Sequence, residues 1–123
     1  MILGIGTDIV AIGRIADILQ SRGERFARRI LSDAELERYH RGPDPVAYLA
    51  KRFAGKEAVS KAFGTGIGAI GWHDIEIVTA PDGAPRVLCH RQAKVRMKAL
   101  GGNEVWISLS DERDFAVAFA ILS

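Results

Sequence analysis

The chain has 123 residues, of which 48% are hydrophobic and 26% charged, with a formal net charge of +2 and a single cysteine. This length predicts one domain spanning residues 1–123, and the composition excludes disordered and collagen-like chains. The longest uninterrupted apolar run, residues 115–122, is too short to cross a membrane, so we expect a soluble, cytoplasmic protein without a membrane partner. The nearly balanced charge argues against a nucleic-acid partner.

The first third of the chain predicts one strand and two helices. Residues 1–10 form a mostly apolar run that is typical of a buried strand. Apolar side chains then recur at helical spacing over residues 12–19, and Gly23 ends that helix. Ser32 followed by Glu35 is a capping box, which predicts a short helix to about residue 40.

The longest helix is predicted over residues 44–63, with Asp44 as its N-cap and Pro45 in its first turn. A glycine-rich loop follows at residues 64–71 and contains the pattern G-x-G-x-x-G. A dinucleotide-binding fingerprint must follow a strand and open a helix, whereas this pattern follows a helix. The loop also lacks the Gly-Lys-Ser/Thr of a P-loop, so both nucleotide motifs are excluded.

The last third predicts a further helix at residues 91–100 and two strand pairs, at residues 74–79 with 86–90 and at residues 105–110 with 115–122. The complete order of elements predicts an α+β fold, with a mainly antiparallel sheet packed against the long helix.

Bulky and small side chains alternate along the last predicted strand. Phe115, Val117 and Phe119 alternate with alanines at positions 116, 118 and 120, so one face of the strand is uniformly small. Small side chains let another backbone approach closely. We expect this face to pack against either a helix of the same chain or a neighbouring subunit.

Glu57 is the most informative residue of the long helix. On a helical wheel, Glu57 falls near the middle of an apolar stripe centred on Phe53, Lys61 lies one turn further on, and Arg52 and Lys56 lie on the opposite flank. A carboxylate on the buried side of a helix is costly unless it is paired or holds a metal. The alternative is a simple ion pair between Glu57 and Lys61 at i, i+4 spacing.

Asp8 is the second candidate, because it closes an apolar strand without being a turn residue. One interpretation is that it caps the helix that follows. The other is that Asp8 and Glu57 form a pair of carboxylates, since two carboxylates with waters are the usual way in which proteins hold Mg²⁺ against a phosphate.

Basic side chains are concentrated in residues 14–52, where nine of them face six acids. They predict either an ordinary solvated surface or a docking surface for an acidic partner, and the second interpretation keeps open a non-catalytic binding module for an acidic protein. The nine are Arg14, Arg22, Arg25, Arg28, Arg29, Arg38, Arg41, Lys51 and Arg52.

Three segments of the chain form recognisable motifs. They are Gly4-Ile5-Gly6-Thr7-Asp8-Ile9-Val10, Phe53-Ala54-Gly55-Lys56-Glu57-Ala58-Val59-Ser60-Lys61-Ala62-Phe63-Gly64-Thr65-Gly66, and Ile107-Ser108-Leu109-Ser110. All three resemble motifs of the holo-[acyl-carrier-protein] synthases, a family of 4′-phosphopantetheinyl transferases. The resemblance runs over the whole chain and implies a homotrimer with active sites between its subunits. It implies transfer of 4′-phosphopantetheine from coenzyme A to a serine of apo-acyl-carrier protein, for fatty acid biosynthesis. The products are holo-acyl-carrier protein and adenosine 3′,5′-bisphosphate, and Mg²⁺ is required.

The same resemblance assigns roles to individual residues. Asp8 and Glu57 match the metal-binding positions, and Lys61 matches a lysine beside the phosphates, so Glu57 and Lys61 are the expected catalytic residues. The proton acceptor stays open among Glu57, Lys61 and a metal-bound water. Arg14, Arg22 and Arg25 match the surface that meets the carrier protein. The matching coenzyme-contacting positions are Arg52, Ser60, Lys61, Gly64, Gly66, Pro85, Ser108 and Asp111, with Pro85 coming from the neighbouring subunit.

Asp111 departs from many members of the family, which carry His at this position. A carboxylate at neutral pH accepts hydrogen bonds and repels phosphate, so we expect Asp111 to face the metal or to pair with a nearby Lys or Arg. The alternative is a residue of the hairpin turn.

Overall fold

The computed structural model describes residues 1–123, which form helices and antiparallel strands. In chain order the elements are β1 (Gly4–Ala11), α1 (Ile12–Arg22), α2 (Glu24–Ile30), α3 (Asp33–Arg41), α4 (Pro45–Ala62), the 3-10 helix η1 (Trp72–Asp74), β2 (Ile75–Thr79), β3 (Pro85–Cys89), α5 (Arg91–Ala99), β4 (Val105–Asp111) and β5 (Phe115–Leu122). None of these helices has both the length and the apolar character needed to span a bilayer.

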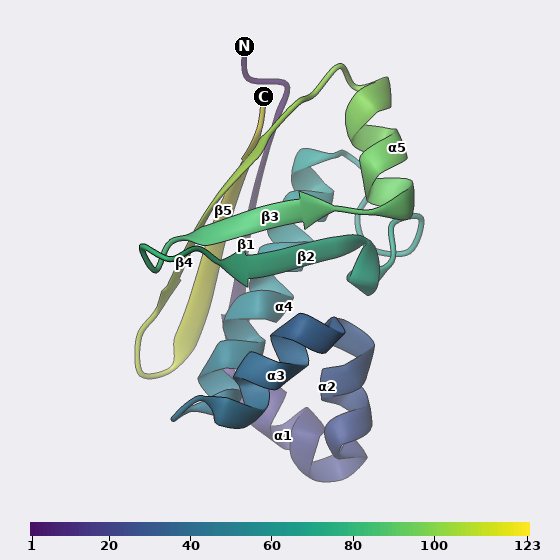
Figure 1. Ribbon diagram of the computed structural model, residues 1–123. Coiled ribbons are helices and arrows are strands. Elements are labelled where there is room, and N and C mark those ends of the chain that lie inside the picture. The colour runs from purple at the N-terminus through teal and green to yellow at the C-terminus, as the bar shows by residue number, and fades with distance from the viewer.

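Helix α4 is the centre of the molecule (Figure 1). A three-stranded antiparallel sheet in the order β1-β5-β4 covers one side of it, and the separate antiparallel pair β2-β3 crosses another side. Helices α1, α2 and α3 gather at the end of α4 where it begins, while α5 lies near its other end. The predicted α+β fold, with a mainly antiparallel sheet packed on the long helix, is confirmed.

Small residues allow β1 and β5 to lie directly against α4. A Cβ atom added at Gly6 would lie 1.9 Å from the carbonyl oxygen of Ala58, and one added at Gly4 would lie 2.0 Å from that of Ala62. Ala118 of β5 and its neighbours at positions 116 and 120 are completely buried on the same side. The small face of β5 therefore packs on a helix of its own chain, and the interpretation that it meets a neighbouring subunit is wrong.

Helices α3 and α4 begin at the side-chain caps predicted from the sequence. The side chains of Ser32 and Glu35 form the capping box of α3, and Asp44 accepts a hydrogen bond from the amide of Ala47 at the start of α4. Helix α2 was not predicted from the sequence. It has only seven residues and no side-chain cap. Gly23, at φ 70°, is both the C-cap of α1 and the N-cap of α2.

The predicted apolar stripe of α4 is confirmed only in part. Its residues Leu49, Ala50 and Ala54 are completely buried, but Phe53 and Glu57 are only partly buried and Lys61 is exposed. Arg52 and Lys56, predicted on the opposite flank, are 5% and 0% exposed. A helical wheel assumes that one face of a helix meets the core. Helix α4 is enclosed on nearly every side by the sheet, the hairpin and the other helices, so its least covered side is the one that carries Glu57.

Candidate active site

Asp8, Glu57 and Lys61 meet on the least covered side of α4. Side chains alternate along a strand, so Asp8 points to the same face of β1 as Gly6, toward α4. The ammonium of Lys61 donates to Asp8 Oδ1 at 3.1 Å and to the carbonyl oxygen of Thr7 at 3.0 Å. The Asp8 side chain is 17% exposed. The structure therefore brings together three residues whose roles were predicted from two separate motifs.

This geometry removes both simpler interpretations of these side chains. Ala11 is the N-cap of α1, and no side chain caps that helix, so Asp8 does not act as its cap. Lys61 forms its ion pair with Asp8 rather than with Glu57 four residues earlier. The simple i, i+4 pair is therefore also wrong.

The electrostatic environment raises the pKa of the Glu57 carboxyl. Burial raises the pKa of the Glu57 carboxyl, and the negative charge of Asp8 raises it further. The positive charges of Lys61 and of Arg14, in the first turn of α1, act in the opposite direction but do not cancel the rise in pKa. Arg14 consequently lies within electrostatic reach of the Glu57 carboxylate.

The donors at this position suit a small, hard cation. Asp8 and Glu57 offer carboxylate oxygens close enough to raise the pKa of Glu57, and no cluster of three or more His, Cys, Asp or Glu side chains occurs in the chain. Mg²⁺ is commonly held by one or two carboxylates, with water and phosphate oxygens as the other ligands. The two residues thus fit Mg²⁺ better than zinc, which prefers four His or Cys ligands in structural sites.

The glycine-rich loop begins at Gly64, three residues after Lys61. Gly64 and Gly66 adopt left-handed conformations, with φ of 73° and 68°, and their amides donate to the carbonyl oxygens of Lys61 and Ser60 at the end of α4. A Cβ added at Gly66 would meet nothing within 4 Å, so the outer side of the loop is open. The Ser60 hydroxyl is buried and donates to the carbonyl oxygen of Glu57 at 2.7 Å, which turns it away from the surface.

Arg52 and Pro85 form a second group, because both line a shallow pocket with Thr79 and Gly83 of the β2-β3 hairpin. The guanidinium of Arg52 lies 4.5 Å from the ring centre of Tyr48, and its Nη2 donates to Thr79 Oγ1 at 3.2 Å. The Nε of Arg52 is buried and has no hydrogen-bond partner. A buried guanidinium with an unused donor is typical of a site that receives an anion.

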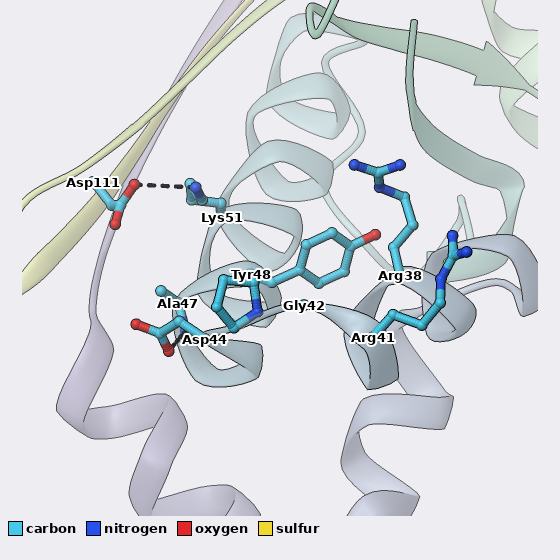
Figure 2. A pocket seen from close by; sticks show the side chains of 9 residues that line it. Arg38, Arg41, Gly42, Asp44, Ala47, Tyr48, Lys51 and Asp111 are labelled. Atoms are coloured by element: carbon cyan, nitrogen blue, oxygen red, sulfur yellow. Dashed lines mark hydrogen bonds and ion pairs between the residues drawn. The ribbon is translucent and has the colours of Figure 1, made fainter. Parts of the chain in front are cut away.

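A neighbouring pocket, shown in Figure 2, continues this group toward α3. Arg38 and Arg41 come from α3, Lys51 comes from α4, and the Tyr48 ring lies between them. Sequence reasoning placed these cations in a basic segment but missed the pocket. The spacing of Arg38 and Arg41, three residues apart on one helix, was the only local signal.

Asp111 is part of this pocket and forms an ion pair with Lys51, with Oδ1 and Nζ 3.1 Å apart (Figure 2). It is the last residue of β4 and pairs in register with Ala116 of β5, so it precedes the hairpin turn. Of the two expected arrangements, the structure shows the pairing with a lysine, while a role of Asp111 toward a metal stays a prediction. The interpretation as a turn residue is wrong.

The remaining predicted residues lie apart from both groups. Ser108 is exposed on the outer face of the sheet, in register with Phe119 of β5. Arg22 and Arg25 are exposed, and they surround Phe26 together with the two other arginines of α2, Arg28 and Arg29. These four arginines form a continuous basic surface at the α1-α2 corner.

Comparisons with known proteins show which family this chain resembles over its whole length. A family model described as the 4′-phosphopantetheinyl transferase superfamily matches residues 4–120. The chain is 50% identical to a holo-[acyl-carrier-protein] synthase of Halorhodospira halophila and 51% identical to one of Nitratidesulfovibrio vulgaris. Each of these alignments covers 99% of this chain and 98% of the relative.

Solved structures of similar proteins extend the agreement to the fold. The crystal structure of holo-[acyl-carrier-protein] synthase from Neisseria meningitidis superimposes with a TM-score of 0.94 at 42% identity, covering 100% of this chain and 99% of that one. The Helicobacter pylori enzyme, in complex with coenzyme A, gives a TM-score of 0.85 at 33% identity, with 97% and 99% covered. On these grounds the chain belongs to the 4′-phosphopantetheinyl transferase superfamily.

Proposed function

We propose that this protein is a holo-[acyl-carrier-protein] synthase, which transfers 4′-phosphopantetheine from coenzyme A to a serine of apo-acyl-carrier protein and releases adenosine 3′,5′-bisphosphate. The observation that carries the proposal is the meeting of Asp8, Glu57 and Lys61 in a chain that matches such synthases over its whole length. We further propose that residues 1–123 act as one domain. A location in the cytoplasm and a role in fatty acid biosynthesis stay predictions.

In the proposed reaction, the serine oxygen of the carrier forms a bond to the β-phosphorus of the coenzyme pyrophosphate. The bond from that phosphorus to the oxygen of the departing adenosine bisphosphate breaks, and the serine proton passes to a base. Burial and the charge of Asp8 raise the pKa of the Glu57 carboxyl, and we propose this carboxylate as the proton acceptor. The Lys61 ammonium, which already donates to two oxygens, has a third N–H to offer to a phosphate oxygen.

Asp8 and Glu57 are the residues that would hold Mg²⁺, whose role when bound is to offset the negative charge of the pyrophosphate. Arg14 adds positive charge beside them. Fixed cationic groups of this kind stabilise the charge that develops on a phosphoryl group during transfer, and most of the acceleration comes from such positioning and electrostatics.

We propose that each coenzyme molecule is bound between two subunits. Arg52 precedes Glu57 by five residues, which places the two side chains about 140° apart around α4. A single chain therefore presents Arg52, Pro85 and Asp111 on a different side from Glu57. A second copy that turns its Arg52 group toward the Glu57 side of the first would complete the site.

We propose that the protein assembles as a homotrimer through the outer face of the three-stranded sheet. This face exposes a group of large apolar side chains that a solvated surface would not favour. They are Ile5, Ile9, Trp106, Phe115, Val117 and Phe119. Val117→Glu should therefore yield monomers with weakened coenzyme binding, as measured by light scattering and calorimetry. A monomer with full activity would contradict a site shared between subunits.

The transfer itself is tested by incubating the purified protein with coenzyme A, Mg²⁺ and apo-carrier protein, followed by mass spectrometry of the carrier. We expect the carrier to gain one phosphopantetheine group, and a carrier whose acceptor serine is replaced by alanine to gain nothing. The alternative function, a non-catalytic binding module for an acidic protein, predicts binding through Arg22 and Arg25 without any change of carrier mass. That alternative leaves the pairing of Asp8 and Glu57 unexplained.

A further inference from the structure

Lys56 is a charged residue that is completely buried and has no place in the proposed reaction. Its side chain is 0% exposed, and that of its partner Glu35 is 1% exposed. All three donors of the ammonium are used: Nζ lies 2.6 Å from the carbonyl oxygen of Ile30, 2.7 Å from Glu35 Oε1 and 3.1 Å from the carbonyl oxygen of Trp72. Burial lowers the pKa of Lys56, and the Glu35 carboxylate opposes this effect.

Glu35 extends these bonds to further elements. Its Oε1 also accepts from the amide of Ser32 at 2.8 Å, and its Oε2 accepts from the amide of Ile77 at 2.8 Å. One ion pair therefore links the last residue of α2, the start of α3, η1 and β2 to helix α4. No other side-chain pair in the protein joins so many elements.

Stability alone does not account for this pair, because well-packed apolar residues of similar volume often replace a buried ion pair without loss. The pair fixes the relative orientation of the elements that it joins, since hydrogen bonds from a charged donor have a defined geometry. An apolar contact also joins α2 to α4, between the rings of Phe26 and Phe53, whose centres are 6.3 Å apart. Apolar contacts are not directional, so the orientation of α2 depends on two hydrogen bonds near its end: the bond from Lys56 to Ile30 and the bond between His73 Nε2 and the carbonyl oxygen of Arg28, at 2.9 Å. Only the first of these comes from α4.

Helix α2 carries Arg25, and Lys56 directly precedes Glu57 on α4. We propose that Lys56 is a positioning residue: it holds α2 in the orientation in which a carrier protein docked on Arg25 presents its serine to Glu57. The inference rests on the proposed function, and it gives a role in that function to a residue outside the metal and coenzyme sites. If it is right, loss of the pair should weaken the reaction with the carrier protein but leave the affinity for coenzyme A unchanged.

The test compares the full-length wild type with Lys56→Met/Glu35→Leu, an apolar pair that avoids leaving either charge alone. Lys94→Met, on the exposed surface of α5, is the matched control. We expect the paired variant to bind coenzyme A within twofold of wild type by calorimetry, while its KM for the carrier rises at least tenfold. The control should change neither value. A wild-type carrier KM in the folded paired variant overturns the role of Lys56, as does an equal loss of coenzyme affinity.

A double-mutant cycle separates positioning from general loosening. Arg25→Ala should raise the carrier KM of the wild type severalfold, but should add less than twofold in the paired variant, because Arg25 is already misplaced there. Fully multiplicative effects overturn the proposal. If the apolar pair does not fold, Lys56→Gln/Glu35→Gln replaces it in these assays, and the same results support or overturn the role of Lys56. Failure of the wild type to modify the carrier instead overturns the proposed function, so the two failures are distinct.

Discussion

Replacing Gly6 with alanine tests whether the contact between β1 and α4 builds the active site. The added Cβ would lie 1.9 Å from the carbonyl oxygen of Ala58 and 2.7 Å from the amide nitrogen of Ala62. Both atoms belong to the backbone of α4, so no side-chain rotation can relieve the contact. The helix and the strand must move apart, and because Asp8 is two residues from Gly6, this movement also separates Asp8 from Glu57.

The size of the effect follows from the geometry. Ordinary contact of a Cβ begins at 3.4 Å, so the two backbones must separate by well over 1 Å. Such a shift leaves gaps along Ala116, Ala118 and Ala120, which are completely buried against α4. Overpacking of a core typically costs about 1–3 kcal/mol, and a clash between two backbones belongs at the upper end. A loss of about 3 kcal/mol lowers the Tm of a domain of this size by roughly 10–15 °C.

Thermal unfolding followed by circular dichroism, together with the carrier-mass assay, measures both consequences. We expect Gly6→Ala to lower Tm by this amount and to abolish most of the transfer at temperatures where it is still folded. Gly13→Ala is the control, because a Cβ there meets nothing within 4 Å and alanine is the better helix former by up to about 1 kcal/mol. A Gly6→Ala protein with wild-type Tm and activity would refute the idea that this close contact positions Asp8.

Three further predictions concern the charged groups. Asp8→Ala and Glu57→Ala should each abolish most of the transfer in the carrier-mass assay, and the double variant should lose little more, because residues that act as a unit are not additive; losses that multiply would exclude a shared metal. Glu57→Gln, measured in EDTA, should raise Tm at pH 7 but not below about pH 4. A carboxyl with a raised pKa holds its proton more tightly in the folded state than in the unfolded state. The stability of the wild type therefore falls as the pH rises past the ordinary Glu pKa of about 4.3. An equal gain in Tm at both pH values would contradict the raised pKa. Arg25→Glu should raise the carrier KM without changing coenzyme affinity, and the control Lys94→Glu should change neither value. The affinity of the wild type for the carrier should fall between low salt and about 0.5 M salt. A carrier KM that changes neither with salt nor with Arg25→Glu would show that the carrier does not dock at the α1-α2 corner.

The candidate site residues were easier to identify from the sequence than their surroundings, and their catalytic roles stay predictions. Asp8 and Glu57 stood out because each carboxylate interrupts an apolar pattern, and Lys61 stood out by its spacing from Glu57. The helical wheel was nevertheless wrong in detail, since Glu57 lies on the least covered side of α4 rather than on its core face. The residues were found because a carboxylate in an apolar segment needs a reason, whichever face it occupies.

Features that depend on a few neighbouring residues could be predicted from the sequence alone. The capping box of Ser32 and Glu35 and the start of α4 at Asp44 follow from side chains that reach their own backbone within three residues. The α+β class follows in the same way from the order of the apolar periods. The helix with no such signal, α2, was missed, because seven residues without a capping side chain leave no local pattern to detect.

Which side chains far apart in the sequence come into contact depends on the tertiary structure. Lys61 pairs with Asp8, 53 residues away, Lys51 pairs with Asp111, and Lys56 is buried beside Glu35. None of these pairs can be deduced from periodicity, because each depends on the sides from which other elements enclose α4. The same enclosure sets Arg52 apart from Glu57 on one helix. Short-range hydrogen bonding and propensity act along the chain, whereas burial and charge pairing act through space, and the active site depends on the second kind of interaction.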